Sequence, residues 1–447
     1  MRGIFTGVVS RRRTITVPTA SAKKKELAYE VNLPSGSYTV VFEATATTNT
    51  YAQKTTFNLT VSTPFSQGFY ILKETAEGDT ELDLSTDDGL VENLMKSLLG
   101  ESLPGKPLGV AVTYDNGYID DQDLEMKANN MVHVFTKEDY RAFRTEDMHP
   151  TFNRDNLMFD PMPADEVFCA AMQDANGIVF LSNKGFYRSA AGVSSGKLGL
   201  PAVNGGSKFV QSFVAGMAAT VFWNGETHGL GEMTDGDWSG KYELPSGFEA
   251  ANLECLASGL NYSATEEIGW FLCEDTNTGK RLLFTVTAIP SFYMVTDIKV
   301  QAVGADKHLA TGKVMAGNGL DASVIYVADN TGVYLFDLTT QTETPFTFQG
   351  IEGEIVYISN NYLYVNTFGT LSPDNFNYLL VATQNGNKYN LYFYDELVGG
   401  IPISKPEKSV TGTGTVKGIR YLSTTLTSDA WQNALFMYTG PLYPFCD

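Results

Sequence analysis

The chain has 447 residues, which is enough for one large domain or several ordinary ones. Its 31 basic and 51 acidic residues give a formal net charge of -20 at pH 7, a charge that repels phosphate backbones and anionic membrane surfaces and so excludes nucleic acid as an expected partner. The 12% aromatic content and 42 glycines are typical of strands and turns and favour an all-β protein.

Membrane and export signals are not expected within this sequence. It contains no run of about 18 apolar residues, so no membrane-spanning helix is predicted. The first residues, MRGIFTG followed by the arginines at 11–13, lack the apolar core of a signal peptide and a cysteine for lipid attachment. Any export signal is therefore expected outside the sequence.

The first part of the chain predicts short strands. Residues 37–44 (SYTVVFEA) and 56–62 (TFNLTVS) alternate apolar with polar side chains, as in strands with one buried face. The LPSG sequence at 33–36 supplies a turn. Because about fifty residues hold too few strands for two full sheets, we expect residues 1–64 to form a partial β-sandwich of the immunoglobulin-like class.

Beyond Thr63 and Pro64 a different rhythm begins, with strand, turn and strand recurring roughly every 40 to 55 residues. Five hairpins are expected, at 69–73 with 80–84, 167–171 with 178–181, 269–273 with 281–286, 324–327 with 333–336, and 378–381 with 389–394. Several of them have Asn-Gly or Asn-Thr-Gly turns, which favour hairpins. Such repeats predict a β-propeller over residues 65–447, with seven or eight blades. A last strand at 434–438 is expected to pair with the first blade and close the ring.

One segment departs from this rhythm. Residues 87–100 place Val91, Leu94, Met95 and Leu98 on one helical face, after acidic residues and before a glycine. We expect a single helix here, packed on the propeller.

Residues 31–40 (VNLPSGSYTV), 57–75 (FNLTVSTPFSQGFYILKET) and 80–84 (TELDL) resemble the PKD-like surface lipoproteins of gut Bacteroidetes. In that family the closing strand of a PKD-like module runs into a Gly-aromatic-aliphatic-Leu-Lys-Glu strand, and GFYILKE at 68–74 fits this pattern. The close match covers roughly residues 27–85. The chain lacks the family's lipoprotein signal and the first half of its module.

The resemblance implies an accessory protein anchored by lipid at the extracellular face of the outer membrane. Members are encoded beside SusC-like transporters and SusD-like binding proteins, so the implied function is nutrient capture at the cell surface, with a glycan or peptide as ligand. The lipid anchor is implied by the family only.

Candidate nucleophiles and bases are weak. Ser194 lies in a G-x-S-x-G sequence, but the loop-like residues after it do not supply the helix that a nucleophile elbow needs. The four histidines, at positions 133, 149, 228 and 308, lack the spacing of a zinc site, and structural or surface roles are favoured for each. No catalytic residue is therefore assigned.

Two acidic segments allow further hypotheses. Residues 115–125 (DNGYIDDQDLE) concentrate oxygen ligands of the kind that calcium takes, although their order is not that of an EF-hand, and an acidic loop in solvent is favoured. Asp235 and Asp237 resemble the Asp-box turns of sialidases only in part, and their adjacency does not show that they face one another across a cleft. No metal or cofactor is expected.

Trp223 and Trp238 lie in Gly-rich sequence, where an exposed ring could stack on a sugar or peptide, and they are the candidate ligand-binding residues. The cysteines, at positions 169, 255, 273 and 446, show no CxxC spacing; buried free thiols are favoured, and one disulfide remains open.

The sequence favours a non-catalytic binding or scaffolding protein. The alternative is a propeller hydrolase acting on glycans or peptides, which needs convergent acidic side chains at the central channel; a structural adhesin contact is a third hypothesis. A deep pocket lined by carboxylates would favour the enzyme, and a shallower face with aromatic and amide side chains would favour the binder.

Overall fold

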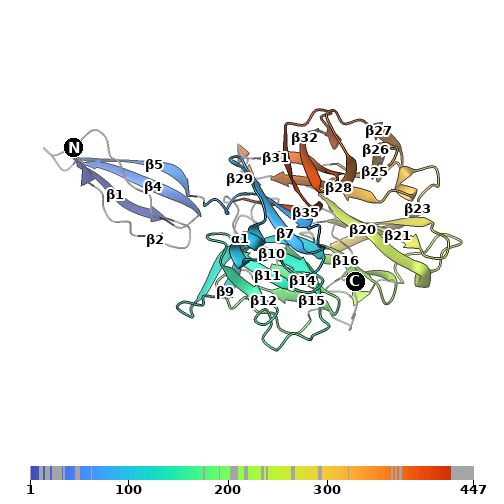
Figure 1. The fold of residues 1–447 in the computed structure, drawn as a ribbon, viewed down its shortest axis with the longest axis horizontal. Coiled ribbons are helices and arrows are strands. Elements are labelled where there is room, and N and C mark those ends of the chain that lie inside the picture. Colours follow the sequence, from blue (N-terminus) through green and yellow to red (C-terminus); the bar gives the residue numbers. More distant parts are fainter. Residues whose placement is uncertain are drawn as a thin grey trace.

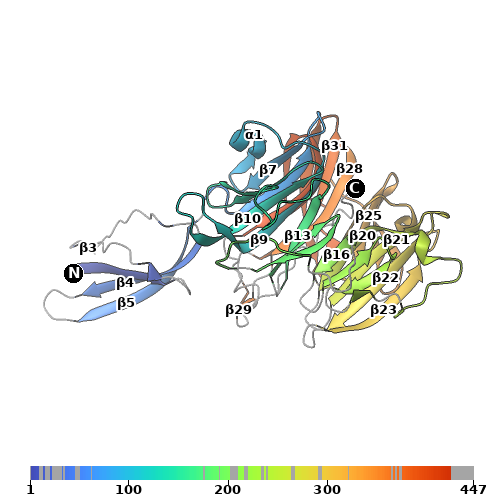
Figure 2. The same cartoon turned by 90° about the horizontal axis from the view of Figure 1, so that it is seen from below.

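A computed structural model gives the fold (Figures 1 and 2). It describes residues 2–9, 14–15, 21–22, 33, 36–45, 51–61, 63–174, 177–190, 192–201, 210–215, 220–232, 236–237, 240–262, 267–289, 294–320, 322–363, 366–367, 370–371 and 375–423. Among these residues, no helix has the length and apolar character needed to cross a membrane.

The N-terminal strands form one antiparallel sheet that projects from the rest of the molecule (Figure 1). Its strands are β1 (Arg2–Val9), β2 (Thr14–Ile15), β3 (Ser21–Ala22), β4 (Gly36–Thr45) and β5 (Ala52–Val61). The expected strands at 37–44 and 56–62 correspond to β4 and β5. The expected partial sandwich is not found in the described residues, because all five strands join a single sheet.

Strands from Gly68 onward build a ring of sheets. The first four sheets contain β35 (Thr415–Leu422), β6 (Gly68–Glu74), β7 (Thr80–Thr86) and β8 (Gly89–Val91); β9 (Pro107–Ile119), β10 (Met126–Thr136), β11 (Tyr140–Arg144) and β12 (Pro150–Asn153); β13 (Phe168–Asp174), β14 (Gly177–Ser182) and β15 (Gly185–Ser189); and β16 (Val210–Ala215), β17 (Thr220–Asn224), β18 (Gly229–Glu232) and β19 (Gly236–Asp237).

The remaining sheets contain β20 (Leu253–Tyr262), β21 (Glu267–Asp275), β22 (Arg281–Ile289) and β23 (Met294–Ala302); β24 (Val314–Gly317), β25 (Val324–Asp329), β26 (Gly332–Asp337) and β27 (Glu343–Phe346); and β28 (Glu354–Leu363), β31 (Phe376–Asn385), β32 (Lys388–Leu397), β33 (Ile401–Pro402) and β34 (Lys408–Thr413). Two short strands, β29 (Asn366–Thr367) and β30 (Thr370–Leu371), pair only with each other.

These sheets are the blades of a β-propeller. The first strand of each sheet contacts that of the next, in the order β35, β9, β13, β16, β20, β24, β28 and back to β35. In the described part of the ring, six sheets have four or more strands, and the β13–β14–β15 sheet has three. The six sheets with four or more strands make a six-bladed arrangement, so the expected seven or eight blades is too many. After β15, the backbone N–H of Leu198 donates to the backbone oxygen of Leu157 instead of adding a fourth strand to the β13–β14–β15 sheet.

A strand from the C-terminal part of the chain closes the ring, as expected, but it is not the strand that was predicted. β35 pairs antiparallel with β6, with Ile419 opposite Ile71. The strand expected at 434–438 lies outside the described residues. The five predicted hairpins are confirmed as β6–β7, β13–β14, β21–β22, β25–β26 and β31–β32.

The predicted helix at 87–100 is confirmed only in the second half of the segment. Residues 89–91 form the edge strand β8, and only α1 (Leu94–Leu99) is helical. The start of α1 is held by buried carboxylates of β7: Glu81 accepts from the backbone N–H groups of Met95 and Lys96, and Asp83 accepts from that of Asn93. Tertiary hydrogen bonds thus replace the acidic caps that the sequence suggested.

Apolar side chains fill the spaces between blades. The largest cluster joins the first, second and last sheets of the ring, and in it Phe69 lies 4.7 Å from Tyr421 and 5.0 Å from Phe393 between ring centroids. Strands such as β14 are buried at every position, because a blade has a neighbour on each face. Polar side chains available for function are therefore confined to strand ends, turns and edges.

Candidate ligand groove and charged hairpin

An open groove of about 920 Å³ lies between the β24–β27 sheet and the start of β28. Its lining combines polar and apolar residues and is largely exposed: Thr311, Lys313, Val314, Ala328, Asp329, Asn330, Thr331, Gly332, Gly353, Glu354 and Ile355. Hydroxyl, amide, ammonium and carboxylate groups thus share one hollow and can make several hydrogen bonds to one ligand.

One wall of the groove is the turn between β25 and β26. The Asp329 carboxylate accepts from the backbone N–H of Thr331 at 2.7 Å and from that of Gly332 at 3.2 Å, as an aspartate does at the start of a tight turn. The Thr331 hydroxyl also donates to this carboxylate at 2.6 Å. The turn leaves Asn330 exposed at its tip.

His308 fixes the other side of Asp329. Its Nδ1 lies 2.7 Å from Asp329 Oδ2, and its ring stacks on Tyr334 with centroids 3.4 Å apart. Glu343 accepts from the backbone N–H groups of His308 and Leu309, so the short 3-10 helix η3 (His308–Ala310) is held at its start. The histidine is therefore locked in place beside the groove.

The charge of Asp329 is stable. Burial alone would raise the pKa of this carboxyl, but hydrogen bonds from Thr331 and His308 outweigh burial and lower the pKa to about 2. Asp329 therefore stays ionised down to acid pH. The groove presents a fixed negative charge together with the exposed side chains of Lys313 and Glu354.

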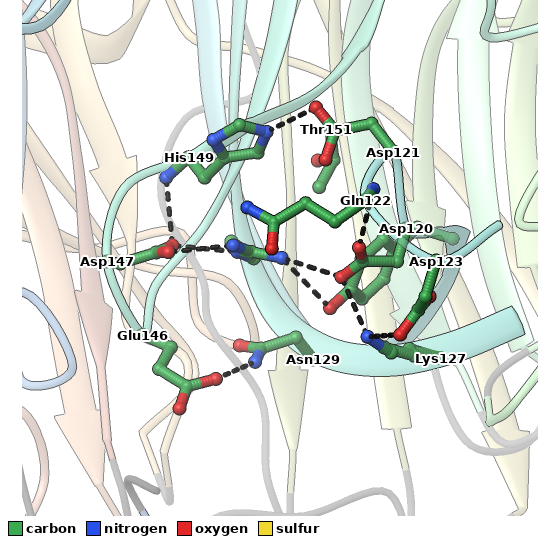
Figure 3. A network of polar contacts seen from close by, with 12 residues as sticks. Asp120, Asp121, Gln122, Asp123, Lys127, Asn129, Glu146, Asp147, His149 and Thr151 are labelled. Atoms are coloured by element: carbon green, nitrogen blue, oxygen red, sulfur yellow. Dashed lines mark hydrogen bonds and ion pairs between the residues drawn. The ribbon is translucent and has the colours of Figure 1, made fainter. Parts of the chain in front are cut away.

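A second polar region lies at the β9–β10 hairpin (Figure 3). Asp120 accepts from Lys127 Nζ at 3.0 Å and from Arg144 Nη1 at 3.1 Å, and Lys127 also lies 2.6 Å from Asp123. Arg144 makes two further bonds, of 2.7 and 2.8 Å, to Asp147. A backbone hydrogen bond from Gln122 and the bond from Lys127 lower the pKa of Asp120 to about 2.

These contacts disfavour the calcium hypothesis for residues 115–125. Oxygens of Asp120 and Asp123 are already occupied by Lys127 and by backbone amides, and Asp121 lies 3.0 Å from His149 Nε2 (Figure 3). Across the residues that the structure describes, no group of three or more His, Cys, Asp or Glu side chains is arranged to hold a metal. The segment is an ion-paired hairpin.

The other histidines have local roles. His133 is fully buried; its Nε2 lies 2.8 Å from the Thr113 hydroxyl and its Nδ1 lies 2.9 Å from the Tyr140 hydroxyl. Burial lowers the pKa of His133 to about 3, so it is neutral. His228 adopts a positive φ of 51° in a turn, and its Nδ1 contacts the backbone oxygen of Leu253 at 2.8 Å.

Ser194 does not lie on a nucleophile elbow. It falls in a bend, and its hydroxyl accepts from the backbone N–H of Gly196 at 3.3 Å. The surrounding loop packs closely on the β9–β10 hairpin: a Cβ on Gly117 would lie 2.1 Å from the Ser194 hydroxyl. The serine thus packs a loop and is not oriented by a histidine in the described contacts.

Trp223 is buried and does not present the exposed ring that the ligand-binding hypothesis needs. Its exposed fraction is 0%, and it packs edge-on against Phe284 at 5.1 Å between centroids. β17 places it between blades, so it has no face open to a ligand. Trp238 and Asp235 lie outside the described residues, and Asp237 belongs to β19.

The sequence did not single out the groove as a site. Its residues come from three separate segments, 311–314, 328–332 and 353–355, and only the propeller brings them together. The Asp-Asn-Thr-Gly turn at 329–332 was visible, but only as a hairpin signal.

No family model matches the chain, and no curated protein matches it. The PKD-like resemblance therefore stays a prediction.

The chain is distantly similar in shape to several solved structures. The Nup133 β-propeller domain of Vanderwaltozyma polyspora has a TM-score of 0.30 and 11% identity, covering 87% of this chain and 95% of that one. An extracellular domain assigned to a one-component system of B. thetaiotaomicron has a TM-score of 0.34 and 12% identity, covering 76% of this chain and 46% of that one. An ACO/RPE65 chimera has a TM-score of 0.40 and 11% identity, covering 81% and 93%. At these TM-scores the likenesses assign neither family nor function; the chain's own ring of sheets establishes the propeller.

Proposed function

We propose that this chain is a non-catalytic binding protein that captures a glycan or peptide in the groove between the β24–β27 sheet and β28. The observation that carries the proposal is the lining of the groove, in which exposed hydrogen-bonding side chains from three segments converge. Sugars and peptide backbones both offer alternating donors and acceptors, which such a lining can satisfy.

The setting that we propose is the extracellular face of the outer membrane, beside a SusC/SusD-like transporter. It rests on the family resemblance of residues 27–85. The projecting N-terminal sheet suits a spacer between an anchor and the propeller (Figure 1). Co-purification with such a transporter from its native membrane would support this part; recovery of the chain from the cytosol would contradict it.

The groove can be tested with two variants. Calorimetry against panels of dietary and host glycans and peptides is expected to find a saturable ligand that is recovered intact. Asn330→Ala and Glu354→Ala are expected to weaken its binding by about tenfold each, the loss of one hydrogen bond to a polar or charged group.

A matched control is Asn277→Ala, which lies in the corresponding Asp-Thr-Asn-Thr-Gly turn of the β21–β22 hairpin and outside the groove. It is expected to bind as the wild type does. Equal loss in control and groove variants, or none in either, would place the ligand elsewhere on the protein.

The hydrolase alternative draws on one observation. Asp329 orients His308 through Nδ1, which leaves Nε2 available to move a proton. Cleavage products that disappear in His308→Gln would favour a hydrolase and would contradict the non-catalytic proposal.

A further inference from the structure

Two cysteines face each other across the β20–β21 strand pair. In this antiparallel pair Cys255 is directly opposite Cys273. Opposite residues in such a pair project from the same face, with Cα atoms roughly 4.5 to 5.5 Å apart. A disulfide spans roughly 4.4 to 6.8 Å between Cα atoms, so the backbone need not move to admit one.

The two sulfur atoms also point toward each other. The Cys255 thiol lies close enough to Cys273 to raise the pKa of the Cys273 thiol, and its Sγ donates to the backbone oxygen of Ala257 at 3.5 Å. Both residues are 0% exposed. Neither cysteine is part of a disulfide in the structure, and both share an apolar cluster with Trp223 and Phe284. A metal role is not favoured, since no third ligand of the His, Cys, Asp or Glu type joins them in the described residues.

We propose that Cys255 and Cys273 form a cross-strand disulfide when the chain folds in an oxidising environment. The oxidant is a small-molecule or protein disulfide. One thiolate attacks it to give a mixed disulfide, and the second thiolate then displaces the reduced carrier thiol. The cysteines lose two electrons and two protons, and the oxidant is reduced to two thiols.

Burial determines when this reaction can occur. Burial raises the pKa of the Cys273 thiol well above its usual range, and the neighbouring Cys255 thiol raises it further. The thiolate is the reactive form, and in the folded protein it is both scarce and shielded. Oxidation therefore belongs to folding, before β20 and β21 are enclosed by the neighbouring blades.

The cross-link would join the inner strand β20 to β21 at one end. At the other end of β20, Asn261 donates to the backbone oxygen of Asn318 at 3.1 Å, in the next sheet. A covalent tie at Cys255 would thus hold the inner strand in the register that this contact needs. The proposal is independent of what the groove binds.

The full chain tests it. Reduced, denatured protein is refolded in a mixture of oxidised and reduced glutathione, denatured again in the presence of N-ethylmaleimide, digested and mapped by mass spectrometry. The peptide of Cys255 is expected to be linked to that of Cys273. Alkylation of both, or linkage of either to another cysteine, would overturn the proposal. Protein refolded while reduced and only then exposed to oxidised glutathione is expected to remain alkylated at both positions; rapid linkage there would contradict the order of events.

The second measurement is urea unfolding. A disulfide at Cys169 is present as well, so reduction alone does not isolate the new cross-link. The double variant Cys255→Ala/Cys273→Ala keeps Cys169 and supplies the matched control. Reduction is expected to lower the midpoint of the oxidised wild type by more than that of the variant, and equal falls would sink the proposal. If the variant does not fold, peptide mapping of the wild type decides alone.

Discussion

Asp83 in β7 and Glu396 in β32 both bury a carboxyl group within the propeller, but their neighbours differ. Asp83 lies 2.7 Å from Lys73 Nζ and also accepts from the Tyr389 hydroxyl at 2.8 Å. Glu396 accepts from the side-chain amides of Asn318 and Asn360, each at 2.8 Å, and contacts the Tyr326 hydroxyl. One carboxyl group has a cation beside it, and the other has only neutral donors in its described contacts.

The neutral partners of Glu396 bear on whether its carboxyl group carries a proton. Tyr326 has a single hydroxyl hydrogen, yet its oxygen lies 2.6 Å from the backbone oxygen of Gly400 as well as beside Glu396. A proton on Glu396 satisfies both contacts, because Glu396 then donates to Tyr326 and Tyr326 donates to Gly400. Burial raises the pKa of Glu396 to about 7, in agreement with this count of hydrogens.

The largest expected effect comes from removing the cation. Lys73→Met leaves the charge of Asp83 buried without its partner, and breaking such a pair costs about 3 to 5 kcal/mol. Urea unfolding at pH 7 should show this loss. The deficit should shrink in acid, where Asp83 is protonated and needs no cation.

The double variant Lys73→Met/Asp83→Asn removes both charges and is expected to recover most of the lost stability. If the double variant is as unstable as Lys73→Met alone, the loss arises from packing, and the proposed role of charge compensation is wrong.

Glu396, whose partners are neutral, should have a smaller effect on the free energy of unfolding, and that effect should depend on pH. Its folded pKa of about 7 exceeds the ordinary value of 4.5, so the folded chain holds the proton more tightly than the unfolded chain. The stability that this group contributes is fully present below pH 4.5 and is lost as pH rises through 7, by roughly 3 kcal/mol.

Glu396→Gln copies the protonated state, since its amide can donate to Tyr326 and its oxygen can accept from the two asparagines. This variant is expected to be more stable than the wild type at pH 8 and equal to it at pH 4, measured as the free energy of unfolding against pH. A variant that keeps the wild-type pH dependence would assign the titration to another group.

The exposed hairpin of Figure 3 should show the smallest effect. Lys127 lies at hydrogen-bond distance from Asp120 and Asp123, and Lys73 lies equally close to Asp83. The side chain of Lys127, however, is one third exposed. Lys127→Ala is expected to cost far less stability than Lys73→Met, and the cost should vanish in about 1 M salt. A loss comparable with that of Lys73→Met would mean that the network holds the hairpin in place.

Much of the fold was predictable, because its signals are local. Alternation and turn residues placed all five predicted hairpins, including β21–β22 and β31–β32. The predicted helix at 87–100 was too long, because the apolar spacing of this segment also suits an edge strand followed by a short helix. Glu81 and Asp83 decide the matter by holding α1 from the neighbouring strand, and their buried positions have no signature in the sequence.

The candidate site was much less predictable. Trp223 was a candidate because an exposed ring in Gly-rich sequence could stack on a ligand, yet Phe284 of the next blade packs against it. That contact depends on how neighbouring blades pack. The groove residues are ordinary loop residues in sequence terms, and they converge only after two blades pack together. Asp329 and His308 are 21 residues apart and meet for the same reason.

Closure of the ring by β35 also constrains how the protein can be made. Gln67 and Tyr421, which are hydrogen-bonded across the closing sheet, are 354 residues apart. At a translation rate of roughly 5 to 20 residues per second, β6 leaves the ribosome about 20 to 70 seconds before its partner strand exists. During that interval the first blade has an open edge of unpaired backbone groups, so the earliest part of the propeller to be synthesised is the last to be completed.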